Sequence, residues 1–464
     1  MSKANTMRAS GGLAGNPRKT ALLILTRLDH ARKTLDYTYD EVLSESPQFS
    51  RQDRVLLNAL VFGVLRWRGR IDWIIKQFSM VPAQKIDAKI LNILRLGAFQ
   101  ILFLDRIPSS AAVNTSVEMS KEFAAPWVVK FVNGLLRNIA RRQDAIVFPP
   151  TEKNPAFALA VKKSFPEWLI KKWLQRFGQL ETEALCDILN TIPPITVRVN
   201  TLKTSRNEVM TSLEKSVGRM TPAVFSPDGV HFYSPQAPIS DINPFKAGGF
   251  QVQDEAAQLV SLFMAPEPGD RALDACAGLG GKTGHIGQLM KNQGLILALD
   301  ANQTKLSRLD AEMNRLGISI VEPLRFNLNT PLPRERFGLF DKILLDAPCS
   351  GLGILRRKPD IKWTLFQKHL TVYKERQLKF LENLSHAVAH SGVLIYAVCS
   401  MEPEENEDVA NIFLSRHPDF ALDDAPLQNY AELKPFIQPP GYFRTFPHRH
   451  DMDGFFAARF KKVK

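Results

Sequence analysis

Apolar residues recur at two different spacings along the chain, and the change between them divides it. Between residues 18 and 145, apolar positions return every three or four residues, as in helices that bury one face. From residue 256 onward, short apolar runs typical of buried strands alternate with helical stretches. This alternation predicts βαβ units and a parallel sheet.

The helical pattern is clearest in residues 51–78, 89–104 and 111–140. In the first of these, one face carries the apolar residues Leu56, Leu57, Leu60, Val64, Leu65, Ile71 and Ile74. The pattern predicts an all-α domain over residues 18–148. Residues 1–17 are polar, small and basic, and we expect a disordered tail there.

A smaller region follows the proline-rich stretch PPTEKNP (149–155), which is typical of a linker. Over residues 155–255 the pattern predicts a helix at 166–177, and then short strands at 195–200, 230–234 and 248–253. Prolines and glycines separate these strands. The region is expected to form a small α+β module.

The C-terminal part, residues 256–464, is expected to be a Rossmann-like α/β domain. Its predicted strands are Ala272–Cys276, Leu295–Asp300, Pro323–Phe326, Lys342–Asp346 and Val393–Val398. Predicted helices cover Thr304–Leu316 and Leu370–His390. Residues 443–446 and 454–462 predict an antiparallel hairpin at the end of the chain.

The charge balance favours a polyanionic partner. The chain has 60 lysines and arginines against 47 acidic residues, a net charge of +13, and nucleic acid is the usual partner of such an excess. Many of the basic residues lie in the helical N-terminal part, so we interpret it as an RNA-binding domain. Arg356, Arg357 and Lys358 form another basic group, which is either a grip on RNA phosphates or a solvated loop.

The spacing of the cysteines favours a reducing compartment, and the length of the apolar runs argues against a membrane span. The four cysteines are widely spaced and do not suggest a disulfide framework. No apolar run reaches the roughly 18 residues that cross a bilayer. We therefore expect a cytoplasmic protein with no membrane contact. The histidines of HRHDMD (448–453) lack a standard metal spacing, so no metal is expected.

Two of the cysteines close predicted strands. Cys349 ends DKILLDAPC and Cys399 ends GVLIYAVC. In open α/β sheets, ligands bind at the carboxyl ends of the strands. Paired thiols at that edge indicate covalent chemistry.

A glycine-rich turn, ALDACAGLGGKTGHI (272–286), joins a predicted strand to a helix. Cys276–Thr283 differs from a phosphate-binding P-loop only in its first residue. The other interpretation is a nucleoside cofactor, whose ribose needs an acidic residue at the end of the next strand. Asp300 stands 19 residues after Gly281 in that place. A P-loop explains neither Asp300 nor the cysteines, so we favour the nucleoside cofactor.

Four motifs together resemble the S-adenosylmethionine-dependent RNA cytosine-5 methyltransferases: DACAGLGGKTGHI, LLDAPCSGLG, RRKPDIKW and YAVCSMEPEENE. RVLLNALVFGVLRWRGRIDWII and FVNGLLRNIARR are similar to the antitermination factor NusB, and VRVNTLK resembles the family's small RNA-binding module. This three-part layout resembles the bacterial 16S rRNA methyltransferases of the Sun/Fmu type.

The resemblance assigns roles to residues of the C-terminal domain. It implies that Cys399 is the nucleophile that adds to C6 of cytosine, and that Cys349 assists product release. Asp346 then holds a cofactor edge or hydrogen-bonds the cytosine ring. Because a thiolate needs a cationic or donor environment, Lys282 is a candidate to favour its formation.

The same resemblance implies a site for S-adenosylmethionine. Asp300 would bind the ribose, Asp346 would contribute, and Asn327 stands where the family has an adenine-binding carboxylate. A leucine also replaces the family's usual proline in the loop. The loop residues are Cys276, Ala277, Gly278, Leu279, Gly280, Gly281 and Lys282.

The expected function is methyl transfer to C5 of a cytidine in 16S rRNA, by a monomer acting on unassembled or partly assembled small-subunit RNA. Two alternatives remain. One is a cytosine-5 methyltransferase for transfer RNA or 23S rRNA, and the other is a non-catalytic RNA-binding assembly or antitermination factor.

Overall fold

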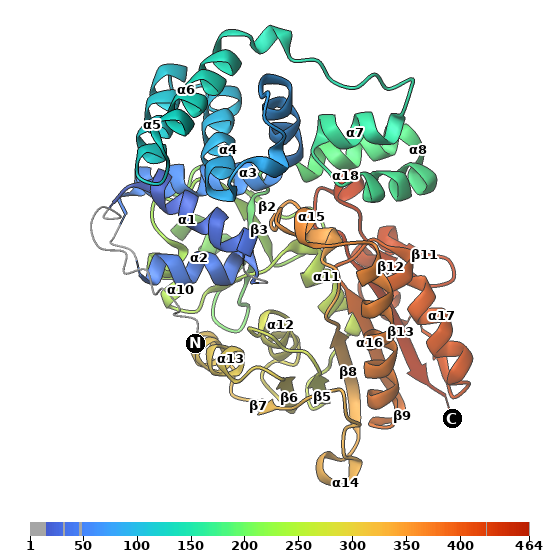
Figure 1. Ribbon diagram of the computed structural model, residues 1–464. Coiled ribbons are helices and arrows are strands. Elements are labelled where there is room, and N and C mark those ends of the chain that lie inside the picture. The colour runs from blue at the N-terminus through green and yellow to red at the C-terminus, as the bar shows by residue number, and fades with distance from the viewer. Residues whose placement is uncertain (1–14, 31–32, 46–48, 424, 464) are drawn as a thin grey trace, which may run out of the picture. The chain divides into compact units, whose positions relative to one another are not determined.

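The computed structural model describes residues 15–30, 33–45, 49–423 and 425–463, which form two compact units (Figure 1). Unit 1 contains the chain up to Asn190 together with Lys358–Thr364, and unit 2 contains Thr191–Arg357 and Leu365–Lys464. The tail expected over residues 1–17 lies almost entirely outside the described residues. The division into three domains at 148 and 255 stays a prediction.

Unit 1 is helical, as its apolar spacing predicts. Its helices are α1 (Pro17–His30), α2 (Leu35–Ser44), α3 (Arg51–Phe78), α4 (Ala88–Phe103), α5 (Ser109–Lys121), α6 (Pro126–Arg141), α7 (Pro155–Lys163), α8 (Glu167–Leu189) and α15 (Ile361–Thr364). The continuous helical pattern at 111–140 divides into α5 and α6. Pro126 begins α6, where its missing N–H costs no helical hydrogen bond.

The core of unit 1 uses the predicted face of α3. Leu57, Leu60, Val64 and Leu65 are buried in one apolar cluster with α1, α4 and α6. Some of the basic side chains of this unit are buried. Arg95 is 4% exposed and its guanidinium pairs with Asp72, with an Nε–Oδ1 distance of 2.7 Å. Such arginines are structural and do not face a ligand.

The segment Lys358–Thr364 belongs to unit 1, although the residues before it and after it in the chain belong to unit 2. Lys362 is buried, and its ammonium donates to Asn190 Oδ1 at 2.7 Å and to Ser164 O at 3.2 Å. Trp363 Nε1 donates to Leu65 O at 2.6 Å. These contacts anchor Lys362 and Trp363, the last two residues of the RRKPDIKW motif, among the helices of unit 1.

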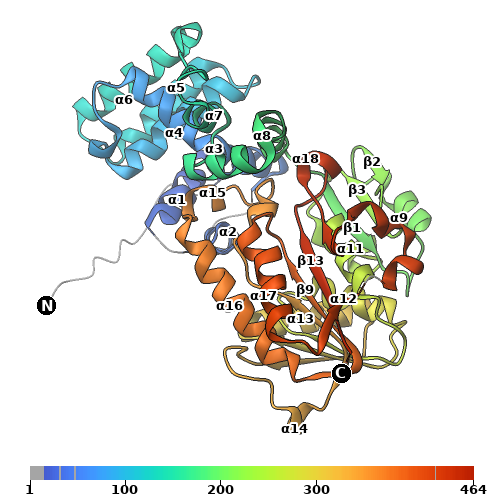
Figure 2. The same ribbon diagram turned by 90° about the vertical axis from the view of Figure 1, so that its right-hand side faces the viewer.

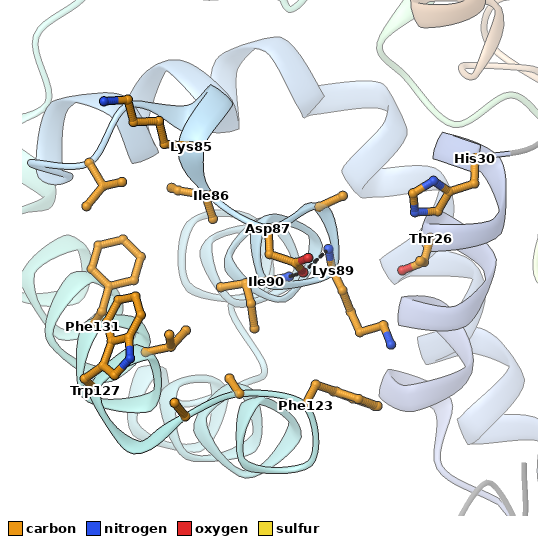
Figure 3. A pocket seen from close by; sticks show the side chains of 15 residues that line it. Thr26, His30, Lys85, Ile86, Asp87, Lys89, Ile90, Phe123, Trp127 and Phe131 are labelled. Carbon is orange, nitrogen blue, oxygen red and sulfur yellow. Dashed lines mark hydrogen bonds between the residues drawn. The ribbon is translucent and has the colours of Figure 1, made fainter. Parts of the chain in front are cut away.

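A cavity of about 700 Å³ opens between the start of α4 and helix α6 of unit 1 (Figure 3). Phe123, Trp127 and Phe131 line it on one side, and Lys89 reaches over the Phe123 ring at 4.1 Å. Trp127 is 72% exposed although it is large and apolar. The cavity therefore combines open aromatic faces with positive charge.

Unit 2 contains a small antiparallel sheet in the order β2-β3-β1-β4, which confirms the α+β expectation. Its elements are β1 (Ile195–Val199), α9 (Arg206–Leu213), β2 (Met220–Pro222), β3 (Gly229–Phe232), α10 (Asn243–Lys246) and β4 (Phe250–Val252). Val197, Val199 and Phe250 share one buried core with α9.

The large sheet of unit 2 has the order β11-β12-β13-β9-β8-β5-β6-β7, and β10 pairs with β13. Strands β5 to β9 pair in parallel, whereas β13 runs antiparallel to β9. The strands are β5 (Arg271–Asp274), β6 (Leu295–Asp300), β7 (Val321–Arg325), β8 (Phe340–Asp346), β9 (Val388–Val398), β10 (Phe420–Leu422), β11 (Ile437–Gln438), β12 (Tyr442–Arg444) and β13 (Phe456–Lys462). The predicted parallel sheet and the terminal hairpin are confirmed.

Helices cover both faces of this sheet (Figure 2). The helices in this part of the chain are α11 (Glu255–Met264), α12 (Gly281–Leu289), α13 (Gln303–Leu316), α14 (Arg334–Phe337), α16 (Lys368–Ser385), α17 (Glu407–Arg416) and α18 (Pro447–His450). Ile343 and Leu345 of β8 pack with α16 and α17, while Leu344 packs with α11 and α12. This alternation is expected for a strand that is buried on both faces.

The prediction that the helix starting at Leu370 extends to His390 is wrong at its C-terminal end. Helix α16 stops at Ser385 and β9 begins at Val388. Val388 pairs with Phe340 of β8, so strand pairing overrides the helical pattern of these residues. Within the described ranges, no helix has the length and apolar content needed to cross a membrane.

Candidate active site

The two predicted cysteines meet at one edge of the large sheet. Strands β8 and β9 are parallel neighbours with Asp346 opposite Ala397. Cys399 directly follows β9, and Cys349 lies three residues beyond β8. Their sulfur atoms are 3.2 Å apart. The register therefore brings together two thiols separated by 50 positions in the sequence.

The glycine loop lies between β5 and α12, at the same end of the parallel strands. Gly280 precedes the first residue of α12 with φ of 85°, and a Cβ there would lie 2.9 Å from the Leu309 side chain. Both the left-handed backbone and the close approach require glycine. The loop thus leaves the amino end of a buried helix open to a ligand.

Asp300 ends β6, the neighbour of β5, as predicted. Its Oδ2 accepts from the Gly278 N–H at 3.2 Å, and its Oδ1 accepts from the Asn302 N–H at 2.8 Å. Asn327 follows β7 and is exposed, and its Oδ1 accepts from the Asn329 backbone at 3.1 Å. The structure therefore places both predicted polar groups, Asp300 and Asn327, at the carboxyl ends of the neighbouring strands β6 and β7.

Lys282 lies in the first turn of α12 and forms an ion pair with Asp346 at the end of β8. Its Nζ lies 2.6 Å from Asp346 Oδ2 and 4.9 Å from the centre of the Phe455 ring. Burial opposes the charge on Lys282, but the charge of Asp346 and its hydrogen bond with Lys282 outweigh burial and raise the pKa of Lys282. The lysine is therefore a buried positive charge beside the site.

The P-loop alternative conflicts with this arrangement. Thr283, which would face a metal-bound phosphate, is buried and donates to Asp274 Oδ2 at 2.7 Å. Asp274 is 1% exposed, and burial raises its pKa to about 7. A carboxyl group directly behind the loop, with Lys282 already paired, disfavours a triphosphate.

The same residues fit a nucleoside cofactor. Asp274 Oδ1 is buried and has no hydrogen-bond partner in the part of the chain that the structure describes. A Cβ built on Gly281 would meet no atom within 4 Å, so there is open space at the start of α12. Burial raises the pKa of Cys276 well above the usual range and so disfavours its reactive thiolate form.

Cys349 differs from Cys399 in its surroundings. The contact with the Cys399 sulfur, burial and the charges of Cys399 and Glu405 raise the pKa of Cys349 well above that of a free thiol. The thiol form of Cys349 is therefore favoured while its sulfur atom contacts that of Cys399.

Arg198 and Gln251 support the glycine loop, and neither was identified from the sequence as a site residue. Arg198 is 1% exposed and donates to Gly281 O at 2.9 Å, and Gln251 Nε2 donates to Gly280 O at 3.3 Å. The sequence suggests Arg198 as part of a modest basic edge of the small module, whereas the structure buries it. Its position between two buried valines of β1 was the available signal, because an arginine there needs an internal partner.

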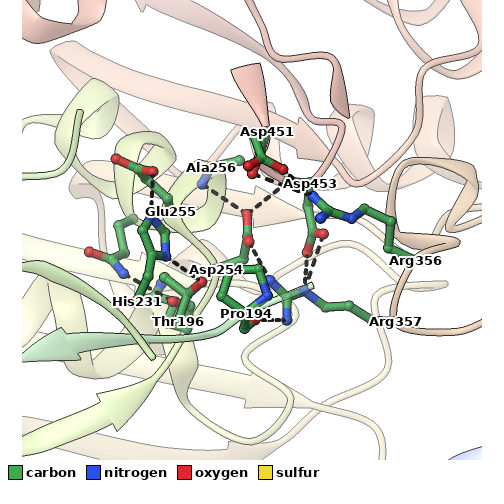
Figure 4. A network of polar contacts seen from close by, with 12 residues as sticks. Pro194, Thr196, His231, Asp254, Glu255, Ala256, Arg356, Arg357, Asp451 and Asp453 are labelled. Atoms are coloured by element: carbon green, nitrogen blue, oxygen red, sulfur yellow. Dashed lines mark hydrogen bonds and ion pairs between the residues drawn. The ribbon is translucent and has the colours of Figure 1, made fainter. Parts of the chain in front are cut away.

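Arg356 and Arg357 do not form the expected open grip on phosphates (Figure 4). Arg357 pairs with Asp254 at 2.7 Å and with Asp453 at 2.9 Å, and Arg356 pairs with Asp451 at 2.7 Å. These pairs tie the loop after Cys349 to the start of α11 and to the segment before β13. The guanidinium groups stabilise the site's own framework.

Three family models match parts of the chain. Residues 261–461 match the model described as 16S rRNA methyltransferase RsmB/F. Residues 15–141 match the NusB family, and residues 165–239 match the ferredoxin-like domain of RsmF/B-like methyltransferases. The matches span the helical part, the small module and the large sheet.

Individual proteins resemble the chain over nearly its whole length. Proteins of Synechocystis sp. and Bacillus subtilis, both described as probable ribosomal RNA small subunit methyltransferase B, are 34% and 33% identical. Each alignment covers 96% of this chain, and 99% and 98% of those proteins. The crystal structure of PH0851 has a TM-score of 0.79 and 29% identity, over 97% of this chain and 100% of that one.

The arrangement of the sheet edge and the full-length similarity agree. The chain belongs to the RsmB/F family of 16S rRNA methyltransferases and carries a NusB domain.

Proposed function

We propose that this protein transfers a methyl group from S-adenosylmethionine to C5 of a cytidine in 16S rRNA. The observation that carries the proposal is the 3.2 Å contact between the Cys349 and Cys399 sulfur atoms, at the strand edge that also holds the glycine loop. Two thiols serve a reaction in which a covalent bond to the base forms and then breaks.

Cys399 attacks the substrate in the first step. Its thiolate adds to C6 of the cytosine, and the electron pair moves to C5, which becomes nucleophilic. The Lys282 ammonium, with its raised pKa, supplies positive charge beside this sulfur. Asp346, at the end of β8, is placed to hydrogen-bond the cytosine ring or the cofactor.

S-adenosylmethionine, when bound, supplies the methyl group that C5 takes. The glycine loop and Asp300 would hold it, with the Asp300 carboxylate on the ribose hydroxyls. Once Cys399 is bonded to C6 and carries no charge, the Cys349 thiol loses its proton to solvent, and the resulting thiolate takes the C5 proton. Loss of that proton returns the electron pair to the C5–C6 bond and expels the Cys399 thiolate, so the enzyme is regenerated.

Methyl transfer to defined RNAs tests the proposal. The purified protein is incubated with S-adenosylmethionine carrying a tritiated methyl group and with 16S rRNA, 23S rRNA or transfer RNA. We expect label in 16S rRNA, and nuclease digestion should recover it as 5-methylcytidine. Label confined to 23S rRNA or transfer RNA would favour the second substrate class, and no label in any RNA would favour the non-catalytic factor.

Removing the ribose contact should weaken cofactor binding. We expect Asp300→Ala to raise the Kd for S-adenosylmethionine by ~10- to 100-fold, the loss of a charged hydrogen-bonding group. Isothermal titration calorimetry measures this directly. Asp310→Ala in α13 is the matched control, because it removes an exposed carboxylate outside the site. An unchanged Kd in Asp300→Ala would contradict the ribose assignment.

We propose that the aromatic cavity of unit 1 binds an unstacked base of the RNA. Stacking on an exposed aromatic side chain contributes ~1–3 kcal/mol per base, and Lys85 and Lys89 add positive charge at the cavity. Trp127→Ala should therefore weaken RNA binding by about 10-fold, with kcat unchanged at saturating RNA. Filter binding and steady-state kinetics measure the two quantities. Wild-type affinity in the variant would exclude stacking on Trp127.

A further inference from the structure

The side chain of Glu405 lies between the two turns that carry the cysteines. Glu405 is in a short 3-10 turn, Pro403–Glu405, just beyond Cys399. Its Oε1 accepts from the Ser350 backbone N–H at 2.8 Å, and its Oε2 accepts from the Ser350 and Ser400 hydroxyls at 2.5 and 2.6 Å. Ser350 follows Cys349 and Ser400 follows Cys399, so one carboxylate holds the residue after each cysteine.

This carboxylate is fully enclosed. Glu405 is 0% exposed, and Gln377 of α16 donates a fourth hydrogen bond to Oε1 at 3.1 Å. The backbone of Glu405 is also fixed, because its carbonyl accepts from the Tyr396 hydroxyl at 2.5 Å. A buried carboxylate that accepts from four donors is rigid, and its removal would leave several polar groups without partners.

The two turns have little else to hold them together at this point. Gly353 N–H donates to Cys399 O at 3.0 Å, and the Ser350 and Ser400 hydroxyls lie 3.2 Å apart. The strand pairing itself ends at Asp346 and Ala397, before either cysteine. The 3.2 Å sulfur separation therefore depends on groups beyond the sheet, and Glu405 makes the largest number of these contacts.

We propose that Glu405 is a positioning residue that fixes Cys349 and Cys399 against each other for the covalent reaction. The catalytic part of this inference rests on the proposed function, whereas the geometric part does not. Acidic residues in the first turn of a helix ordinarily stabilise its N-terminus, and Glu407 and Asp408 lie in the first turn of α17. Glu405 has a separate task.

Three substitutions in the full-length protein separate position from charge. Glu405→Ala removes the carboxylate. Glu405→Asp keeps its charge but is one methylene too short to reach both turns. Glu405→Gln keeps the length, and its amide can accept from the Ser350 N–H while donating to the two hydroxyls, which can rotate. Asp408→Asn, in the first turn of α17, is the matched control, because it also changes a carboxylate to an amide and its partner is Lys374 of α16, outside both cysteine turns.

The first readout needs no methyl transfer. Diamide oxidises two adjacent thiols to a disulfide: an S–S bond forms, and the two hydrogens pass to the diazene, which becomes a hydrazine. Mass spectrometry then measures the rate at which the Cys349–Cys399 disulfide forms. We expect it to form at least ~10-fold more slowly in Glu405→Ala and Glu405→Asp, and near the wild-type rate in Glu405→Gln and Asp408→Asn.

The second readout is the kinetics of methyl transfer. We expect kcat to fall by ~100-fold in the alanine and aspartate variants, because a small displacement of reacting groups has that effect, with KM for RNA and S-adenosylmethionine unchanged. The glutamine variant should recover most of the rate. Circular dichroism and thermal unfolding identify any variant that fails to fold, and the aspartate variant then replaces the alanine one.

Wild-type disulfide formation or wild-type kcat in folded Glu405→Ala or Glu405→Asp would overturn the proposal. Equal losses in the glutamine variant would overturn it too, since they would show that charge and not position matters. If the wild-type protein transfers no methyl group, the proposed function fails, and the disulfide rates still decide whether Glu405 positions the two cysteines.

Discussion

Replacing Cys399 by alanine should abolish methyl transfer while RNA binding survives. Without the sulfur no bond forms to C6, and C5 of the intact cytosine ring is too poor a nucleophile to take the methyl group. Removal of a covalent nucleophile lowers kcat by ~10⁴- to 10⁶-fold in enzymes that depend on one. We expect tritium transfer to 16S rRNA to fall to background and the Kd for RNA, measured by filter binding, to stay near the wild-type value.

Cys186→Ala is the matched control for that experiment. Cys186 is buried in α8 of unit 1, so the variant also lacks one sulfur but keeps the whole sheet edge intact. It should retain methyl transfer. Turnover by Cys399→Ala at the wild-type rate would remove Cys399 from the role of nucleophile.

Replacing Cys349 by alanine should trap the protein on its RNA. Cys399 can still add to C6 and the methyl group can still arrive, but the C5 proton stays in place and the thiolate cannot leave. A covalent protein–RNA complex should therefore accumulate in the presence of S-adenosylmethionine. It should appear as a slowly migrating band on denaturing gels that contain labelled RNA.

The double variant Cys349→Ala/Cys399→Ala is the control for the trapped complex. It removes the attacking sulfur as well, so no band should form. A band of equal intensity in the double variant would show that another residue attacks the base. Free RNA and normal turnover in the single variant would contradict the release role of Cys349.

The position of the two cysteines was predictable because parallel strands place their carboxyl ends together. The apolar runs that end near Asp346 and Val398 predict two buried strands of one parallel sheet, and the structure shows that these strands, β8 and β9, are neighbours. The same reasoning places Asp300 and the glycine loop at this edge, where the structure has them. The sheet determines the position of residues that directly follow one of its strands.

The partners of buried charged groups were not predictable in this way. Glu405 was one acidic residue among several after Cys399, and only the packing of two turns shows that it accepts from Ser350, 55 positions away. Arg356 and Arg357 looked like an open basic group because their carboxylate partners are remote in the sequence. The pattern of apolar residues predicts which positions are buried and which secondary structure they form. It does not predict which residue pairs with a buried charged side chain.

The alternatives differ in what they require of the sheet edge. A non-catalytic RNA-binding factor has no need for two thiols 3.2 Å apart beside a buried lysine. A methyltransferase for transfer RNA or 23S rRNA would need the same edge, so geometry does not separate the substrates. Similarity to proteins described as small subunit methyltransferases, over 96% of the chain, favours 16S rRNA.

Bisulfite sequencing of RNA from cells with and without the gene tests the central claim most directly. Bisulfite converts cytidine to uridine but leaves 5-methylcytidine, so a methylated position is read as cytidine. We predict one 16S rRNA position that resists conversion when the gene is present and converts when it is deleted, with resistance restored by the wild-type gene but not by Cys399→Ala. Identical patterns in both strains, or a difference found only in transfer RNA or 23S rRNA, would contradict it.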